Sequence, residues 1–287
     1  TTTLTGSGVI DNTSGYKYLA RRLDVSGRLA FGNSSGYYLE VEAGGNLHLT
    51  ATGTLATDAT NGLIYFTGSS TTSSLSGDAG ASVDVGNGTT LALRANGNAT
   101  NLISGSFAMT GAGALVLDSG VFTTGSDTTF SGAGILQLGN ATLGGTHRLN
   151  IGSAFNWTGG TFAGSGTTVL SGHSVIDNTS AYKQLNRRLD VTGDLVFGNS
   201  NGYYLTIGNG GDLHLSSGGQ LATSATNGFI YIAAGTGGTA RLSADAGSSI
   251  AVGDGTTLTL RGDGTTGNQI VGAFGLSGTG AIVIDSG

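Results

Sequence analysis

A long internal repeat constrains this 287-residue chain more than any other feature. The segment VIDNTSGYKYLARRLDV, which begins at Val9, recurs almost unchanged as VIDNTSAYKQLNRRLDV, which begins at Val175, so the two copies lie 166 positions apart. The same offset relates FGNSSGYYL at Phe31 to FGNSNGYYL at Phe197, and an extra residue near position 70 makes the offset 167 for later matches. Self-similarity at a fixed offset is the signature of repeat architectures.

The repeat divides the chain into two units. Residues 1–166 form one complete unit, and residues 167–287 form a second, incomplete unit that continues directly from the first. The second unit has no counterpart of residues 121–166, and the sequence begins without an initiator methionine or a signal peptide. We therefore expect the sequence to be a window into a longer array of such units.

Within each unit, short runs place apolar residues at every second position, which is the period of a β-strand. Runs such as RLDV at 22–25, NLHL at 46–49 and LALR at 91–94 are separated by Gly, Asn, Asp or Ser, as turns require. Strands of successive coils would pair in parallel, with three strands in roughly 22–25 residues and about 4.8 Å between coils. The pattern predicts an all-β fold, a right-handed parallel β-helix (β-solenoid).

The composition agrees with a chain that is sheet along most of its length. It contains 55 glycines, no proline and no cysteine, and proline is the residue that the middle of a sheet excludes. The absence of cysteine excludes a disulfide framework, and the formal net charge of −6 argues against nucleic acid as a partner. No apolar run is long enough to span a membrane. An antiparallel sandwich or barrel is the alternative fold, since it also has strands at short, regular spacing.

Several glycine-rich segments resemble the repeats of bacterial surface exoproteins. FNWTGGTFAGSGTTVLSG (155–172) is similar to the W-x-G-G-x-x-x-G-S-G-T repeats of filamentous-haemagglutinin-like proteins of two-partner secretion. FAMTGAGALVLDSG (107–120), FSGAGILQLGNATLGG (130–145) and FGLSGTGAIVIDSG (274–287) resemble the G-x-G-x-L-x-L-x-G repeats of autotransporter passengers. The resemblance implies a right-handed parallel β-helix, export across a Gram-negative outer membrane, and a role as a long surface stalk or adhesin.

A basic, aromatic element occurs once in each unit, as GYKYLARRLDV (15–25) and AYKQLNRRLDV (181–191). One interpretation is a surface that binds acidic polysaccharide or a neighbouring filament. The other is a structural loop, in which the basic side chains pair with Asp11 and Asp24, or with Asp177 and Asp190. The candidate contact residues of this element are Tyr16, Lys17, Arg21, Arg22, Tyr182, Lys183, Arg187 and Arg188.

Paired tyrosines form a second candidate surface. The sequence YYL occurs at 37–39 and again at 203–205. Strand alternation predicts one ring inside and its neighbour outside, and Tyr37 and Tyr203 are the candidate contact residues. An exposed ring could stack on sugars, or it could simply cover a turn.

The sequence offers little support for catalysis. Glycoside cleavage needs two carboxylates about 5–10 Å apart. The only glutamates, Glu40 and Glu42, share one face of a single expected strand, and Thr206 and Gly208 replace them in the second unit. We expect no enzymatic activity and no cofactor.

Metal and receptor motifs are equally weak. The four histidines are scattered, and GDGTTLTLRGDG lacks the nine-residue rhythm of calcium-binding repeats. We expect no metal, and we interpret Asp254 and Asp263 as turn formers. The tripeptide RGD at 261–263 can engage integrins in other surface proteins, but the first unit has Arg-Ala-Asn at this place.

Together these observations predict a structural and adhesive rod, in an extracellular filament or a cell-surface stalk of a Gram-negative bacterium, that supports attachment or cell–cell contact. Its expected partners are further copies of the repeat, in the same chain or in stacked chains, with polysaccharide or neighbouring filaments as further candidates. One alternative is a separate subunit that polymerises head to tail through its end coils. The other is a carbohydrate-active or carbohydrate-binding β-helix.

Overall fold

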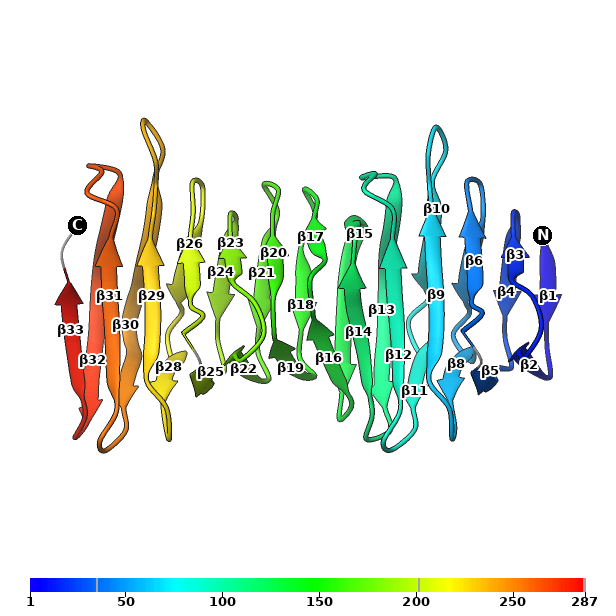
Figure 1. Cartoon of the computed structure of the whole chain (residues 1–287), viewed down its shortest axis with the longest axis horizontal. Coiled ribbons are helices and arrows are strands. Elements are labelled where there is room, and N and C mark those ends of the chain that lie inside the picture. The colour runs from blue at the N-terminus through cyan, green and yellow to red at the C-terminus, as the bar shows by residue number, and fades with distance from the viewer. Residues whose placement is uncertain (35, 201, 286–287) are drawn as a thin grey trace. The chain divides into compact units, whose positions relative to one another are not determined.

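The computed structural model describes residues 1–34, 36–200 and 202–285 (Figure 1). Within these residues, β-strands are the only regular secondary structure, and they pair in parallel. The predicted all-β parallel β-solenoid is therefore confirmed, with about 12 turns. In the described part of the chain no helix is long and apolar enough to cross a membrane.

The chain folds as two compact units, Thr1–Ala154 and Phe155–Gly287. The sequence repeat ends later, at residue 166. Residues 155–166, which close the first sequence repeat, therefore belong to the second structural unit, where they form part of its first coil. This arrangement determines which basic residues are covered and which are not.

In the first coils of the first unit, each coil contributes one strand to each of three faces (Figure 1). One face contains β1 (Thr2–Leu4), β4 (Arg22–Val25), β7 (Asn46–Leu49) and β10 (Ser73–Gly77). The second contains β2 (Ser7–Asn12), β5 (Arg28–Ser34), β8 (Thr54–Thr57) and β11 (Ser82–Val85). The third contains β3 (Lys17–Leu19), β6 (Leu39–Glu42), β9 (Gly62–Thr67), β12 (Thr90–Ala95), β14 (Ala114–Ser119) and β16 (Ile135–Leu138). The remaining strands are β13 (Asn101–Thr110), β15 (Val121–Gly132), β17 (Thr142–Gly144) and β18 (Leu149–Ile151).

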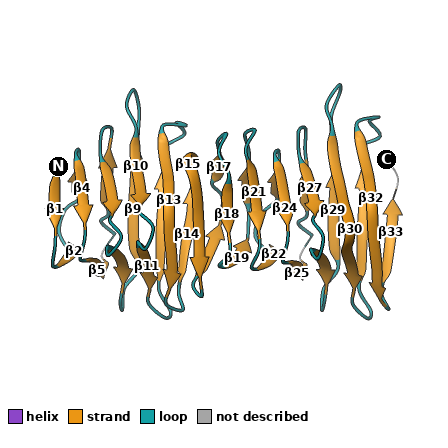
Figure 2. Cartoon of the chain, turned by 180° about the vertical axis from the view of Figure 1, so that it is seen from behind, coloured by secondary structure: helices purple, strands orange, loops and turns teal. Residues whose placement is uncertain are grey.

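The second unit repeats this plan, seen from behind in Figure 2. Its first coils contain β19 (Ala154–Trp157), β20 (Gly160–Phe162), β21 (Thr167–Leu170), β22 (His173–Asn178), β23 (Lys183–Leu185), β24 (Arg188–Val191) and β25 (Asp194–Ser200). The later coils contain β26 (Leu205–Ile207), β27 (Asp212–Leu215), β28 (Gln220–Thr223), β29 (Gly228–Ile232), β30 (Ala240–Val252), β31 (Thr257–Gly262), β32 (Asn268–Gly278) and β33 (Ala281–Asp285).

The register of the ladders gives the length of each coil. Leu23 pairs with Leu47, 24 positions later, and Leu47 pairs with Leu75, 28 positions later. The first value agrees with the predicted coil, whereas the second exceeds it because the loop between β9 and β10 adds residues. Coils of unequal length are compatible with one register because the extra residues lie in turns rather than in the ladder.

The core of each unit consists of ladders of identical or similar apolar side chains. Leu47, Leu75 and Ile103 follow one another in register and are almost completely buried. Phe107 and Phe130 stack with their ring centroids 5.3 Å apart. Complete burial of such a side chain contributes about 1.5–3 kcal/mol, so each coil is stabilised mainly by the coils on either side of it.

Glycine allows one strand to continue around a corner. In β13, Gly105 has φ +95°, and a Cβ at this position would lie 1.9 Å from the carbonyl oxygen of Gly77. Only glycine combines this backbone conformation with so close an approach. As a result β13 runs across two faces without a turn, and pairs with β10 before the corner and with β11 after it.

Candidate functional site

The lysine of the basic element closes its own loop. Lys17 and Lys183 begin β3 and β23 at equivalent places. The Lys17 Nζ donates to the carbonyls of Ser14 and Gly15, both at 2.8 Å, and the Lys183 Nζ donates to the carbonyl of Ala181 at 2.6 Å. These bonds stay within the loop that precedes each strand and support the structural interpretation of the element.

The second copy of the element is buried, which corrects the surface role expected for two of its residues. Lys183 is 0% exposed and Arg187 is 1% exposed. Gly160 of β20 lies beside Lys183 in the ladder. The Arg187 guanidinium donates to the carbonyls of Gly166, at 2.8 Å, and Ala163, at 3.3 Å. The preceding coil therefore covers both basic side chains.

In the first unit, no described coil covers the equivalent residues. Lys17 is half-buried, and Arg21 and Tyr18 are exposed. The two elements are nearly identical in sequence, so their environments differ only through the coil that packs against them, which local sequence patterns do not reveal.

Burial also changes the acid–base properties of the covered copy. Desolvation lowers the pKa of Lys183 to about 8, although the nearby carboxylate of Asp177 opposes this change. Desolvation likewise lowers the pKa of Arg187 to about 10. Both groups are cations at neutral pH, and the main-chain carbonyls that they contact offset part of the lost hydration.

The ion pairs expected within the element are present in part. Arg22 pairs with Asp24, and Arg188 pairs with Asp190, each at 2.6 Å. Arg188 also reaches Asp212 on the next coil at 3.2 Å. All these arginines are exposed at the surface, so the pairs contribute about 0–1 kcal/mol each.

Asp11 and Asp177, which precede the two copies of the element, accept hydrogen bonds within local turns. The Asp11 carboxylate accepts a hydrogen bond from the Thr13 amide at 2.9 Å, and Asp177 accepts one from the Thr179 amide at 3.0 Å. Both are local turns of the kind that Asp favours. The carboxylate of Asp177 also lies near Lys183, whose pKa it raises against the effect of burial.

The tyrosines form a cluster in which rings from successive coils touch. The Tyr16 ring lies 5.2 Å from Tyr37 and 4.5 Å from Tyr38, and Tyr38 lies 5.6 Å from Tyr65 in β9. Both Tyr37 and Tyr38 are half-buried, so the predicted alternation is wrong, because these residues lie in the loop before β6. The second unit repeats the cluster with Tyr182, Tyr203, Tyr204 and Tyr231.

A cleft that the sequence pattern did not predict opens beside each cluster. In the first unit, Tyr38, Tyr65 and Arg94 line a cleft of about 340 Å³. The equivalent cleft in the second unit, of about 260 Å³, is lined by Tyr204, Phe229, Tyr231 and Arg261. We call these the tyrosine–arginine clefts. These clefts could have been predicted only from the ladder register, which places Tyr65 beside Arg94 and Tyr231 beside Arg261 on the next coil.

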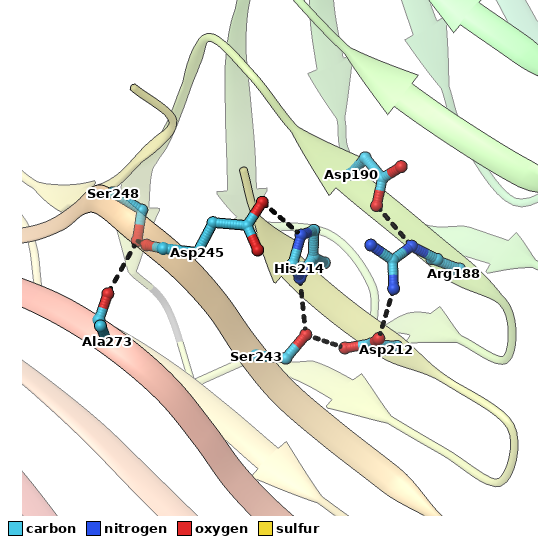
Figure 3. Close-up of polar contacts among 8 residues, drawn as sticks. All are labelled: Arg188, Asp190, Asp212, His214, Ser243, Asp245, Ser248 and Ala273. Carbon is cyan, nitrogen blue, oxygen red and sulfur yellow. Dashed lines mark hydrogen bonds and ion pairs between the residues drawn. The ribbon is translucent and has the colours of Figure 1, made fainter. Parts of the chain in front are cut away.

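Figure 3 shows a polar network that crosses β24, β27 and β30 of the second unit. Arg188 pairs with Asp212, and the hydroxyl of Ser243 donates to Asp212 at 2.6 Å. The His214 ring lies between two oxygens, with Nδ1 2.8 Å from Ser243 Oγ and Nε2 3.3 Å from Asp245. Serine, histidine and aspartate are the residue types of a hydrolytic triad.

The direction of the hydrogen bonds favours a structural role for this network. A carboxylate only accepts, so Ser243 donates its proton to Asp212 and must receive a hydrogen bond from the imidazole. A nucleophilic serine needs the reverse arrangement, in which the imidazole accepts the hydroxyl proton. The first unit repeats this arrangement, with the amide of Asn46 in place of the Asp212 carboxylate. Ser76 donates to Asn46 at 2.9 Å and lies 2.9 Å from His48.

The RGD tripeptide is engaged by other parts of the chain. Arg261 pairs with Asp285. The Asp263 carboxylate accepts hydrogen bonds from the Thr265 hydroxyl and from the Asn268 amide, each at 2.6 Å. These bonds, above all the one from Thr265, lower the pKa of Asp263 to about 2. Asp263 is therefore a turn former, as predicted.

The last coils of the second unit expose side chains that the first unit buries. Ile270, Leu276 and Ile284 are 43%, 68% and 76% exposed. An apolar cavity of about 370 Å³ opens among them. Their counterparts in the first repeat are at most 1% exposed, and they are Ile103, Met109 and Leu117.

Among the described residues, no group of three or more His, Cys, Asp or Glu side chains is placed to hold a metal ion. No family model matches the chain, and no curated protein or solved structure is significantly similar to it. The chemistry of its own surfaces is therefore the basis for assigning a function.

Proposed function

We propose that this chain is a structural segment of an extracellular filament or cell-surface stalk, a rod that grows by stacking ~166-residue units coil on coil. The observation that carries the proposal is the continuous register of the parallel ladders, in which each coil pairs with the next. Leu23, Leu47 and Leu75 follow one another in register, and Leu47 and Leu75 are completely buried between neighbouring coils.

Neighbouring coils stabilise one another through these buried ladders. Burying a Leu or Ile side chain contributes about 1.5–3 kcal/mol. In a solenoid, stability is a sum of interfaces between neighbouring coils, so a rod of this kind can be extended one coil at a time.

Contacts between one repeat and the next support coil-on-coil stacking. In the second unit, residues 160–166 cover Lys183 and Arg187 and supply carbonyl acceptors. These residues close the first sequence repeat, whereas Lys183 and Arg187 belong to the second, so the junction of two repeats is a packed interface between coils.

The sequence resemblance supports a surface location. The glycine-rich segments are similar to those of filamentous-haemagglutinin-like proteins and autotransporter passengers, which are exported by Gram-negative bacteria. The hydrogen-bond directions around Ser76 and Ser243 favour a scaffold over a hydrolase. Attachment or cell–cell contact is the role that we propose for such a rod.

An extended chain tests coil stacking directly. A copy of residues 121–166 would be added after residue 287, and hydrogen exchange and thermal unfolding would be measured. We expect slower exchange in β32 and β33 and a higher unfolding midpoint than in the original chain. A scrambled extension of the same composition is the control. Unchanged exchange in β33 would exclude continuation of the rod at this edge.

The head-to-tail subunit is the second candidate, because a repetitive solenoid could also stack on a separate copy of itself. Direct stacking of two copies would place the apolar β32–β33 edge against Lys17 and Arg21, which prefer the carbonyl-rich segment 155–166. Sedimentation velocity of the original chain separates the two candidates. Concentration-dependent growth into long species would favour separate subunits over a continuous tandem rod.

A further inference from the structure

The two tyrosine–arginine clefts have the same design. In each, a tyrosine from the loop meets a tyrosine from the strand edge to face, with interplanar angles of 74° for Tyr38 and Tyr65 and 72° for Tyr204 and Tyr231. Two rings at nearly a right angle form a corner. Because parallel coils are about 4.8 Å apart, the arginine of the next coil completes the wall.

The arginine in each cleft is held by an aspartate from the following coil. The Arg94 Nε lies 2.6 Å from Asp118, and Arg261 pairs with Asp285 in the same way. Arg94 and Asp118 are 50% and 35% exposed, so the pair adds at most about 1 kcal/mol to stability. The pair holds a guanidinium and a carboxylate side by side at the cleft wall.

The balance of charge in the cleft limits what it can bind. The carboxylate of Asp118 offsets the charge of Arg94, and Glu40 lies beside Tyr65 in the ladder. Burial raises the pKa of Tyr38, and Glu40 raises it further, which places negative charge near this ring. An anionic ligand would meet two carboxylates and only one paired cation, so a neutral ligand fits better.

The lining suits a ligand that is apolar on one face and polar at its edge. Small-ligand sites combine aromatic walls with a few convergent polar groups, and tyrosine offers both a flat apolar ring and a hydroxyl. A pyranose has this character, because its C–H groups lie on its faces and its hydroxyls point outward. A guanidinium and a carboxylate side by side match the donors and acceptors of adjacent hydroxyls.

We propose that each tyrosine–arginine cleft binds one residue of a neutral polysaccharide. The sugar ring packs on Tyr65 in the first unit and on Tyr231 in the second, and its hydroxyls bond with the Arg–Asp pair. Tyr16 and Tyr182 extend the aromatic surface onto the preceding coil, where a neighbouring sugar residue would lie. This proposal rests on the proposed function, because it names the class of ligand that an adhesive rod would bind.

The two clefts differ in ways that predict unequal affinity. Phe229 stands where the first unit has Leu63, and the Arg261 guanidinium lies 5.3 Å from the Phe229 ring centre. Thr206 replaces Glu40, so the second cleft also lacks that carboxylate. The larger aromatic surface of the second cleft should make it the tighter of the two.

Calorimetric titration of the full chain tests the proposal. The probes are maltohexaose, cellohexaose and chitohexaose, with a heparin hexasaccharide as the anionic probe and a tyrosine-rich peptide as the non-sugar probe. We expect at least one neutral hexasaccharide to bind at two sites per chain. Tyr231→Ala should remove the tighter site, and Tyr65→Ala with Tyr231→Ala should weaken binding at least tenfold.

Matched variants separate binding from folding. Arg28→Gln removes an exposed arginine that pairs with Asp58 on a different face of the solenoid, and it should change affinity less than twofold. Arg94→Gln with Arg261→Gln tests the polar wall at exposed positions if the tyrosine variants unfold, and it should also weaken binding at least tenfold. Binding of only the heparin or peptide probe, or of no probe, would overturn the proposal, as would neutral-sugar binding unaffected by both double variants. Exchange of β33 in the extended chain reports coil stacking separately, so either proposal can fail alone.

Discussion

The Nε atom of Arg187 donates to the carbonyl oxygen of Gly166 at 2.8 Å and thereby links one coil to the coil before it. The side chain is almost completely covered, and its second bond, to Ala163, ends on the same segment. Arg187 was a candidate for ligand binding in the sequence, but in the structure it connects two coils inside the solenoid.

The chain supplies its own control for the contribution of this arginine. We expect Arg187→Ala to lower the free energy of unfolding by about 2–4 kcal/mol, because it leaves a cavity and two carbonyls without their donor. Arg21→Ala removes the identical residue where no described coil covers it, and should change the free energy by less than about 0.5 kcal/mol. Urea denaturation of both variants measures the difference. Equal effects would show that the covering coil does not determine the role of the residue.

Lys183 gives the fold a predictable dependence on pH. Its pKa falls from 10.5 to about 8 on folding because burial removes water from the ammonium. Between these values the unfolded chain binds more protons than the folded chain, so stability must rise with pH in this window. The free energy of unfolding of the original chain, relative to Lys183→Met, should therefore increase between about pH 8 and pH 10.5. Denaturant titrations at several pH values measure it, and a constant difference would contradict the assigned burial.

The solenoid fold could be predicted from the sequence because its determinants are local and repeated. Alternating runs such as RLDV and NLHL predict strands, and their spacing sets three strands in a coil. The internal repeat then shows that the same plan continues for the whole chain. Longer coils, such as the one from Leu47 to Leu75, were less predictable, because loop insertions do not disturb the ladder.

The candidate sites were harder to predict because they depend on which coils are neighbours. Lys17 and Lys183 have almost the same flanking sequence, but only the second lies beneath residues 160–166. Tyr65 and Arg94 are 29 positions apart in the sequence, and they come together only through the ladder register. A search that aligns successive coils rather than successive repeats would have found the tyrosine–arginine clefts.

Asn101 provides a test of polar packing inside the solenoid. It is completely buried in β13, where its amide oxygen accepts from Gly68 and Ser73 and its amide nitrogen donates to Asn96 and Asn98. Replacement by Leu would leave several buried groups without partners, each costing about 1–3 kcal/mol. We expect Asn101→Leu to destabilise the chain by more than Asn268→Leu.

The comparison depends on the different surroundings of the two asparagines. Asn268 is the equivalent residue on β32, but it is only half-buried, so water can replace part of its bonding. Thermal unfolding of the two variants measures the difference. A larger loss of stability in Asn268→Leu than in Asn101→Leu would mean that the last coils contribute more to stability than their exposure indicates.

The hydrogen bonds of the serine–histidine network predict that its serines are not nucleophilic. A fluorophosphonate probe labels serines whose proton is taken by an imidazole, and Ser243 instead gives its proton to Asp212. We expect Ser243 and Ser76 to remain unlabelled under conditions that label a serine hydrolase completely, with mass spectrometry as the readout. Asp212→Asn gives the second unit the residue that Asn46 supplies in the first, and it should also remain unlabelled, because an amide oxygen still accepts the serine proton. Labelling of Ser243 that disappears in His214→Gln would show that the imidazole activates this hydroxyl, and a scaffold role alone would no longer account for the network.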